Sequence, residues 1–254
     1  MTPPRAVDLD AIAIAPAPEI VALSGAIADA AVERGFKRLE SIDAILLDTL
    51  MEWHVDGERC IAISGAGLSA RTNPADSVRA GTEARTTYRI VYDTHFSHAA
   101  LADAIARALP EQLVMQFNLQ EQVDFTLRIL RGERTLYEYS NAPSFFNWGR
   151  CIGHAEPAQL ARPETAALAA AIGHPEKEAA LQDLFQTISA KVPGESAGTR
   201  GRKKGGVYDA VQALAGHAGL PRLYRFFEGW MKSSLDWDED DVETVLAFRA
   251  EAKA

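Results

Sequence analysis

Apolar and polar residues alternate in three successive segments between Gln112 and Tyr139. A period of two is typical of strands that bury one face of an antiparallel sheet. The segments are joined by short steps at Gln120-Glu121 and at Arg131-Gly132-Glu133, where glycine permits the positive φ of a hairpin turn. The pattern therefore predicts a three-stranded antiparallel β-meander.

One face of this meander is apolar, and the other carries Gln116, Asp124, Arg128 and Glu138. The Ala-rich stretch 98–109 is predicted to form a helix. Because this helix directly precedes the meander, we expect it to cover the apolar face.

The rest of the chain adds two predicted strands and a series of helices. Residues 1–17 are rich in Pro and Ala and predict a tail. The expected fold is α+β, with an antiparallel β-meander sheet packed by helices and followed by an all-helical C-terminal part. The expected strands are 59–64 and 86–92, and the expected helices are 19–32, 36–54, 98–109, 163–172, 175–191, 207–217, 221–232 and 238–252.

Changes in composition divide the chain into three predicted regions. Residues 1–34 form an N-terminal tail and helix, 35–155 an α+β domain, and 156–254 a helical C-terminal region. Within the last region, residues 192–206 have the Gly-rich, polar composition of a flexible linker.

Charge and cysteine usage limit the function classes. The 254 residues carry a net charge of −9 with a pI of about 5.2, which disfavours a nucleic-acid binder and suits a basic protein partner. The two cysteines, Cys60 and Cys151, are far apart and indicate no disulfide framework. The N-terminus lacks the pattern of a signal peptide, and no stretch is long and apolar enough for a membrane span. We expect a cytoplasmic protein with no membrane partner.

A metal site is one candidate chemistry. Asp93, His95 and His98 place a carboxylate and two imidazoles just beyond a predicted strand, and zinc takes such ligands. Cys151 and His154 are the candidates for completing the site. The alternative is that Asp93 or Ser97 caps the following helix while the histidines lie half-exposed near its positive end.

A cysteine nucleophile is a second candidate. Cys151 with His154 or His95 would form a thiolate–imidazole pair, and Arg150 would lower the pKa of a neighbouring thiol. The alternative is a buried structural cysteine.

The segment after the meander is rich in aromatic residues. Aromatic side chains beside amides and hydroxyls are typical of binding hot spots. The alternative is that the aromatic rings anchor this loop in the core. The candidate binding residues are Tyr137, Tyr139, Asn141, Phe145, Phe146, Asn147, Trp148 and Arg150.

A glycine-rich stretch follows the first predicted strand of the domain. The run from Ser64 to Ala70 fits G-x-G-x-x-A, in which glycines let backbone amides approach a pyrophosphate. Its residues 65–69 resemble an element of the NAD-dependent sirtuin deacylases. The chain then departs from that family, since it lacks the family's later His-Gly and paired zinc cysteines. The alternative is a turn of small residues.

The hairpin and the loop after it resemble a segment of small uncharacterised bacterial proteins, some of them immunity proteins encoded beside toxins. The resemblance implies a bacterial accessory protein rather than a mechanism. The matching residues are Leu130, Gly132, Tyr139, Asn141, Pro143 and Phe146.

These patterns favour a non-catalytic protein that binds and occludes a protein partner, in the manner of an immunity or accessory protein. No cofactor is expected. The alternative is a metal- or cysteine-dependent hydrolase that uses segments 93–98 and 151–154.

Overall fold

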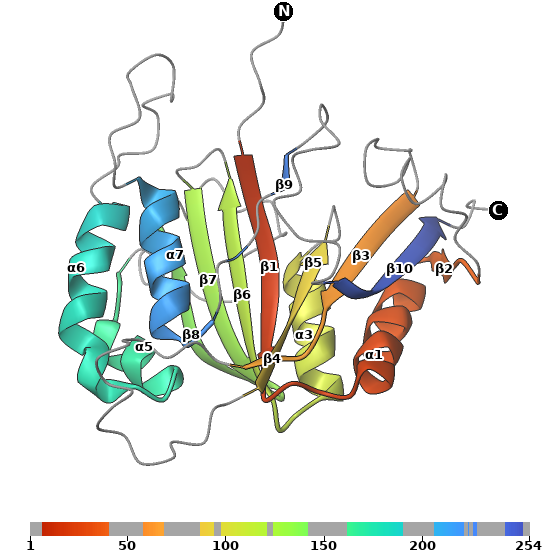
Figure 1. Ribbon diagram of the computed structural model, residues 1–254, viewed down its shortest axis with the longest axis horizontal. Coiled ribbons are helices and arrows are strands. Elements are labelled where there is room, and N and C mark those ends of the chain that lie inside the picture. The colour runs from red at the N-terminus through yellow and green to blue at the C-terminus, as the bar shows by residue number, and fades with distance from the viewer. Residues whose placement is uncertain are drawn as a thin grey trace, which may run out of the picture.

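The computed structural model describes ten segments of the chain, and the strands among them form one antiparallel sheet (Figure 1). Eight strands follow one path in the order β2-β10-β3-β5-β1-β6-β7-β8, while β4 pairs with β5 and β9 with β1. The described residues are 7–40, 58–68, 87–93, 98–120, 124–141, 162–189, 206–220, 223, 226–227 and 242–250.

The elements have the following bounds. The strands are β1 (Val7–Ala15), β2 (Phe36–Arg38), β3 (Glu58–Ser64), β4 (Gly67–Leu68), β5 (Thr87–Asp93), β6 (Leu113–Gln120), β7 (Asp124–Arg131), β8 (Arg134–Ser140), β9 (Phe226–Phe227) and β10 (Val242–Ala250). The helices are α1 (Ile20–Glu33), α3 (His98–Ala108), α5 (Thr165–Ala171), the 3-10 helix η2 (Pro175–Lys177), α6 (Glu178–Ser189) and α7 (Val207–His217).

Helices cover both faces of the sheet. One buried cluster joins α1 and α3 to the strand residues Ile12, Ile14 and Val114. A second cluster joins α5, α6 and α7 to the opposite face, through residues such as Phe117 and Leu127. Figure 1 shows α5, α6 and α7 grouped at one end of the sheet and α1 and α3 at the other. The described elements therefore form three layers, with the sheet in the middle.

Strand β1 is the centre of this arrangement. It pairs with β5 on one side and with β6 on the other. Its residues Ala11, Ile12, Ala13 and Ile14 are all at most 1% exposed and alternate between the two clusters. A strand covered on both faces is apolar at successive positions, which explains the run from Ala11 to Ile14.

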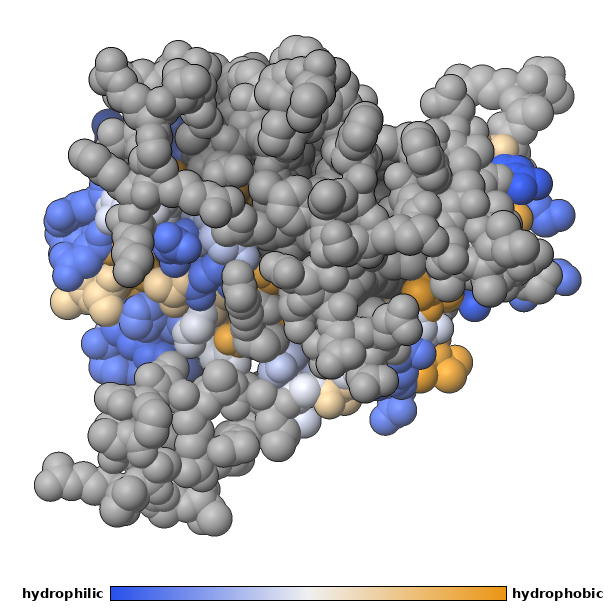
Figure 2. Space-filling model, turned by 45° about the horizontal axis from the view of Figure 1, so that its top comes forward, coloured by the Kyte–Doolittle hydropathy of each residue, from blue (hydrophilic) through white to orange (hydrophobic). Residues whose placement is uncertain are grey.

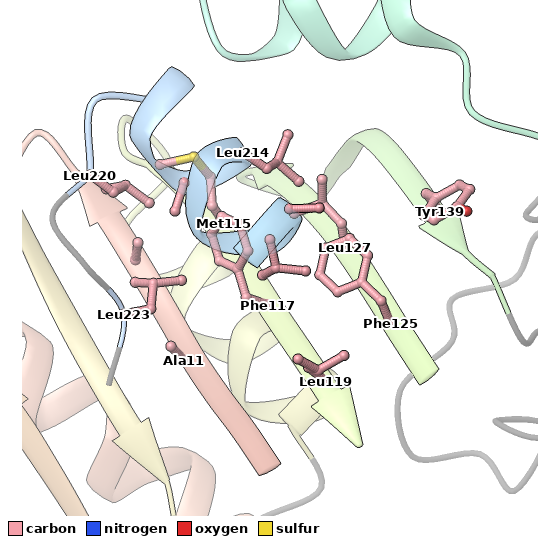
Figure 3. Close-up of a cluster of buried hydrophobic side chains, with 14 of the residues drawn as sticks. Ala11, Met115, Phe117, Leu119, Phe125, Leu127, Tyr139, Leu214, Leu220 and Leu223 are labelled. Carbon is pink, nitrogen blue, oxygen red and sulfur yellow. The ribbon is translucent and has the colours of Figure 1, made fainter. Parts of the chain in front are cut away.

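The meander contributes most of the core beneath the C-terminal helices. Phe117 lies opposite Leu127 in the ladder between β6 and β7. Figure 3 shows Met115, Phe117 and Leu127 on the side of the sheet where α7 carries Leu214. The turn between β7 and β8 contains Gly132 at φ +57, a conformation that side chains with a Cβ rarely adopt.

The α+β class and the β-meander are confirmed. Strands β6, β7 and β8 match the three predicted segments, and α7 has the predicted bounds 207–217. The predicted helices 19–32, 98–109, 163–172 and 175–191 correspond to α1, α3, α5 and the η2–α6 pair.

The predicted cover of the meander is wrong. Helix α3 packs over Val114 and Leu130, on the face that also carries Arg128. The apolar face with Met115 and Phe117 is covered by the C-terminal helices instead. The reason is that this sheet has helices on both sides, so neither face of the meander is left to water.

Two N-terminal predictions are also wrong. Residues 7–15 form the central strand β1 rather than a tail, and Phe36–Arg38 form strand β2 rather than the start of a helix. Proline and alanine are common in tails. Here Pro16 follows the strand, and the small side chains of the alanines pack at the centre of the sheet. Residues 41–57 lie outside the described part of the chain.

The expectation of an all-helical C-terminal part is corrected by two strands. Val242–Ala250 form β10, which pairs with β3 and β2, and Phe226–Phe227 form β9 against β1. The apolar residues of 242–250 fit both a helical and a two-residue period, and the available partner strands decide between them. The sheet thus includes strands from all three predicted regions.

The helices that the structure describes do not include one long and apolar enough to cross a membrane. Large exposed hydrophobic side chains in the described part are Val21 and Val32, both on α1. Figure 2 shows hydrophilic and hydrophobic residues interspersed over the coloured part of one face.

Candidate functional site

Buried polar residues are concentrated on the α3 face of the meander. On this face, residues that lie opposite one another on neighbouring strands form rows across the sheet. Three successive rows along the strands change from apolar to polar. The first row, with Ile14, Val114 and Leu130, is apolar and lies in the core. The next two rows contain the polar residues, and we name them the charged row and the polar row.

The charged row consists of Gln116, Arg128 and Glu138, which lie opposite one another on β6, β7 and β8. Arg128 is 4% exposed and donates from Nε to Glu138 Oε1 at 2.8 Å. It also donates from Nη2 to Asp103 Oδ1 of α3 at 2.9 Å and from Nη1 to Gln116 Oε1 at 3.4 Å. Two carboxylates, that of Glu138 buried and that of Asp103 38% exposed, therefore face one buried guanidinium.

The polar row consists of Asp93, Asp10, Asn118, Thr126 and Ser140 on five neighbouring strands. Asn118 lies opposite Asp10 on one side and Thr126 on the other, and Thr126 lies opposite Ser140. The Thr126 and Ser140 hydroxyl groups are 3.4 Å apart. The row extends from β5 to β8 without an apolar residue.

Two aspartates follow the end of the ladder between β1 and β5. The last pair of this ladder is Ala11 with Tyr92, and Asp10 and Asp93 are the next residues along the two strands. Both positions fall on the face of Ile12 and Val91, which is the α3 face.

Some polar atoms in these rows are buried without a partner. Asn118 and Gln116 are each 1% exposed. Within the described chain, Asn118 Nδ2, Asn118 Oδ1 and Gln116 Nε2 are buried side-chain atoms with no hydrogen-bond partner. A buried amide without partners destabilises the folded chain. Such a group calls for a specific reason to be there, and a bound ligand is one.

The sequence-predicted metal site is only partly described. Asp93 ends β5 and His98 begins α3, whereas His95, Cys151 and His154 lie outside the described residues. Within the described ranges, no group of three or more His, Cys, Asp or Glu residues is placed to hold a metal ion. The thiolate–imidazole prediction, which also involves Arg150, lies outside the described residues too.

The predicted aromatic recognition surface is buried where it is described. Tyr139 is 0% exposed and its ring meets that of Phe185 edge to face, with centroids 4.7 Å apart. Tyr137 is 5% exposed, and burial, with Tyr139 and Glu164 nearby, raises its pKa. These two tyrosines are core residues, so the prediction of an exposed surface is wrong for them. Phe145, Phe146, Asn147 and Trp148 lie outside the described residues.

Asn141 has a structural role at the end of β8. Its Oδ1 accepts from the Phe125 N–H at 2.7 Å, and its Nδ2 donates to the Ile188 carbonyl of α6 at 3.4 Å. The residue therefore fixes the end of the meander to the C-terminal helices. This contact explains its position without a binding role.

One glycine of the G-x-G-x-x-A stretch, Gly67, serves packing. Gly67 lies in β4 opposite Tyr88 of β5. A Cβ at Gly67 would come within 2.5 Å of the Tyr88 ring, so the glycine allows this ring to approach the backbone. Ser64 instead accepts the Ile90 N–H at its Oγ, at 2.8 Å. Gly67 and Leu68 thus form a short strand on β5, and Ser64 holds the neighbouring backbone.

The candidate site was partly visible in the sequence. The sequence placed Gln116, Arg128 and Glu138 on one face of the predicted meander. A polar face is expected to be exposed to water, which would satisfy the hydrogen bonds of these side chains. Asp10 and Asn118 are far apart in the sequence, and only the pairing of β1 with β6 places them opposite each other. The alternation within 7–15 was the available signal, and the surrounding prolines and alanines obscured it.

The chain matches no protein-family model, and comparisons with curated proteins and with solved structures find no match. The resemblance to bacterial accessory proteins therefore stays a prediction.

Proposed function

We propose that this protein binds a small polar ligand, neutral or cationic, at the polar row of its sheet. The observation that carries the proposal is Asn118, whose buried amide group has neither its donor nor its acceptor satisfied within the described chain. An amide offers one side of a paired donor and acceptor contact. A ligand with complementary groups would remove the penalty of leaving both atoms unpaired.

The charge of the surrounding residues favours a neutral or cationic ligand. Arg128 is the buried cation of the charged row, and Glu138 and Asp103 already face it. The sequence adds Asp10 at the register position opposite Asn118. An anion bound there would meet more negative than positive charge.

The occlusion of a basic protein partner stays a second hypothesis, supported by the net charge of −9. Of its predicted contact residues, Tyr137 and Tyr139 are buried, and Asn141 is half-buried and bonded to α6. The others lie outside the described chain. The hydrolase alternative shares Asp93 with the proposed ligand site. Neither hypothesis explains the unpaired amide of Asn118.

The variant Asn118→Leu tests whether the amide is kept for a ligand. Leucine has a similar size and removes both unpaired atoms, so the free protein should gain about 1–3 kcal/mol in free energy of unfolding. Urea unfolding monitored by circular dichroism measures this change. Arg128→Met is the matched control in the next row, because its polar partners are present, and it should lose about 3–5 kcal/mol. A less stable Asn118→Leu would show that Asn118 is a structural residue.

Thermal unfolding with defined compounds tests the ligand class. The probes are Mg²⁺, spermidine, glucose and adenosine, with phosphate and citrate as anions. At least one neutral or cationic probe should raise the Tm of the wild type and leave that of Asn118→Leu unchanged. Stabilisation by the anions alone, or by none of the probes, would contradict the proposal.

A further inference from the structure

We propose that two copies of this chain form a dimer through the outer side of helix α1, with the two helices packed antiparallel. Four residues at steps of four, three and four positions share this side of the helix. We name them the α1 stripe, and they are Val21, Gly25, Ala28 and Val32. The stripe lies opposite the buried side of α1, which carries Leu23, Ala26, Ile27, Ala30 and Ala31.

The α1 stripe is apolar although it lies on the exposed side of the helix. The large hydrophobic residues that are exposed in the described part of the chain, Val21 and Val32, both belong to it, and their exposed fractions are 80% and 61%. The charged residues of α1, Asp29 and Glu33, lie beside the stripe rather than in it. A helix that is apolar on every side is typically covered on every side. Figure 1 shows α1 at the end of the layer that it shares with α3. The stripe therefore has the composition of a contact surface.

The position of Gly25 is a separate observation that points to a close partner. Glycine in the middle of a helix destabilises the helix relative to alanine. A Cβ at Gly25 would have no atom within 4 Å among its described neighbours, so packing within one copy does not explain the glycine. On an exposed helix side, the missing side chain allows the backbone of a second helix to approach closely. Gly25 and Ala28 are the middle residues of the stripe, so the closest approach falls at its centre.

The order of the residues identifies the partner as a second copy. The stripe has its large residues at both ends and its small residues in the middle, and the spacing is the same from either end. A two-fold axis between positions 26 and 27 therefore places Val21 of each copy at the level of Val32 of the other, and Gly25 at the level of Ala28. Such self-complementarity is what an isologous dimer requires. The small residues bring the two helix axes close, and the valines fill the space where the axes diverge.

Charge favours the antiparallel direction. The N-terminal end of a helix carries a partial positive charge and the C-terminal end a partial negative charge, so an antiparallel pair places opposite ends side by side. The N-cap Glu19 of each copy also comes to the level of the C-cap Arg34 of the other. A parallel pair would align like ends instead.

The size of the contact sets the strength of the dimer. The 14 residues of α1 give a helix about 21 Å long. One side of such a helix is smaller than the surface of about 800 Å² per partner that a standard stable interface buries. We therefore expect a reversible dimer with a Kd of the order of 10–100 μM.

Sedimentation equilibrium of the full chain, at protein concentrations below and above this Kd, tests the proposal. The wild type should pass from monomer to dimer, and its Tm should rise with protein concentration. Gly25→Glu places a carboxylate at the centre of the contact and should weaken the dimer by at least about tenfold. Ala22→Glu adds the same charge at an exposed position of α1 outside the stripe, and this matched control should associate as the wild type does.

The stability of the dilute protein separates loss of contact from loss of folding. Glutamate is a better helix former than glycine, so the urea midpoint of dilute Gly25→Glu should be at or above that of the dilute wild type. A dimer that Gly25→Glu leaves unchanged, or a wild type that stays monomeric at every concentration, would overturn the proposal.

Cross-linking with a short bismaleimide tests the antiparallel direction. An equimolar mixture of Val21→Cys and Val32→Cys should give a cross-linked dimer. Either variant alone should give much less, because equal positions lie at opposite ends of the contact. Peptide mapping by mass spectrometry separates these links from those of the native Cys60 and Cys151. Efficient links between two copies of the same variant, with none gained in the mixture, would overturn the antiparallel dimer.

Discussion

Two buried arginines lie on the same face of the sheet and have different roles. Arg128 belongs to the charged row of the candidate site. Arg89 on β5 is 6% exposed and binds three segments that are far apart in the sequence. It donates from Nε to the Pro18 carbonyl at 2.8 Å and from Nη1 to the Ser64 carbonyl at 3.0 Å, and it pairs with Glu243 of β10. Its side chain thus joins the β1–α1 junction, the end of β3 and the start of β10.

We expect Arg89→Met to lower the free energy of unfolding by about 2–4 kcal/mol, because two carbonyl groups lose their donor in a largely buried place. Urea unfolding measures the change. Glu243→Gln is the matched variant and should lose much less, since the Glu243 side chain is 38% exposed and glutamine still accepts a hydrogen bond. Equal losses in the two variants would show that the ion pair, rather than the carbonyl contacts, stabilises this junction.

At the scale of elements, local sequence patterns predicted where helices and strands form better than they predicted which elements pack together. The predicted helix 207–217 matches α7, and alternation predicted β6, β7 and β8. Neither pattern indicates which face meets which helix, because a half-buried strand alternates in the same way whichever layer covers it. The predicted position of α3 was wrong for this reason.

The contact between η2 and α7 illustrates how packing changes the chemistry of a residue. Lys177 Nζ donates to the His217 carbonyl at 2.7 Å, which links the two elements. Burial, followed by the charges of Lys177 and His174, holds the pKa of His217 below its ordinary value of 6.5. Desolvation disfavours the imidazolium form, so the folded protein binds a proton at this site less readily than the unfolded chain.

This lowered pKa predicts a pH dependence of stability. As the pH falls below 6.5, the unfolded chain gains a proton at His217 before the folded protein does, and the folded state loses stability. The variant His217→Gln should therefore lose less stability than the wild type between about pH 7 and pH 5. Urea midpoints across this range measure the difference. Parallel curves for the two proteins would show that His217 does not contribute.

At the scale of the whole molecule, the sheet is assembled from distant parts of the chain. β10 is inserted between β2 and β3, and β1 between β5 and β6. In the β10–β3 ladder, Ala247 lies opposite Cys60, and the predicted C-terminal helix would not produce this pairing. The register can therefore be tested by one substitution.

Ala247→Cys should form a disulfide with the native Cys60 under mild oxidation. Opposite residues of an antiparallel pair have Cα atoms about 4.5–5.5 Å apart, which lies within the range of a disulfide. Peptide mapping by mass spectrometry under non-reducing conditions identifies the bond. Leu246→Cys is the control, because Leu246 lies opposite Ile61 and on the other face. A Leu246→Cys bond to Cys60, or an Ala247→Cys bond to Cys151 instead, would refute the register.

The sequence by itself determined the local structure where one residue pattern allowed one answer. The alternation in 113–139 is the example, because the turn glycine and the polar face exclude other conformations there. It also indicated Gln116, Arg128 and Glu138 as one polar face.

Only the tertiary structure decided which segments are central and what the polar residues face. The strands Val7–Ala15 and Val242–Ala250 were predicted as a tail and a helix, because their strand conformation depends on hydrogen bonds to distant partners. The pairing of β1 with β6 also places Asp10 opposite Asn118. Residues far apart in sequence become a candidate site only when the register of several strands is fixed, and no local pattern contains that information.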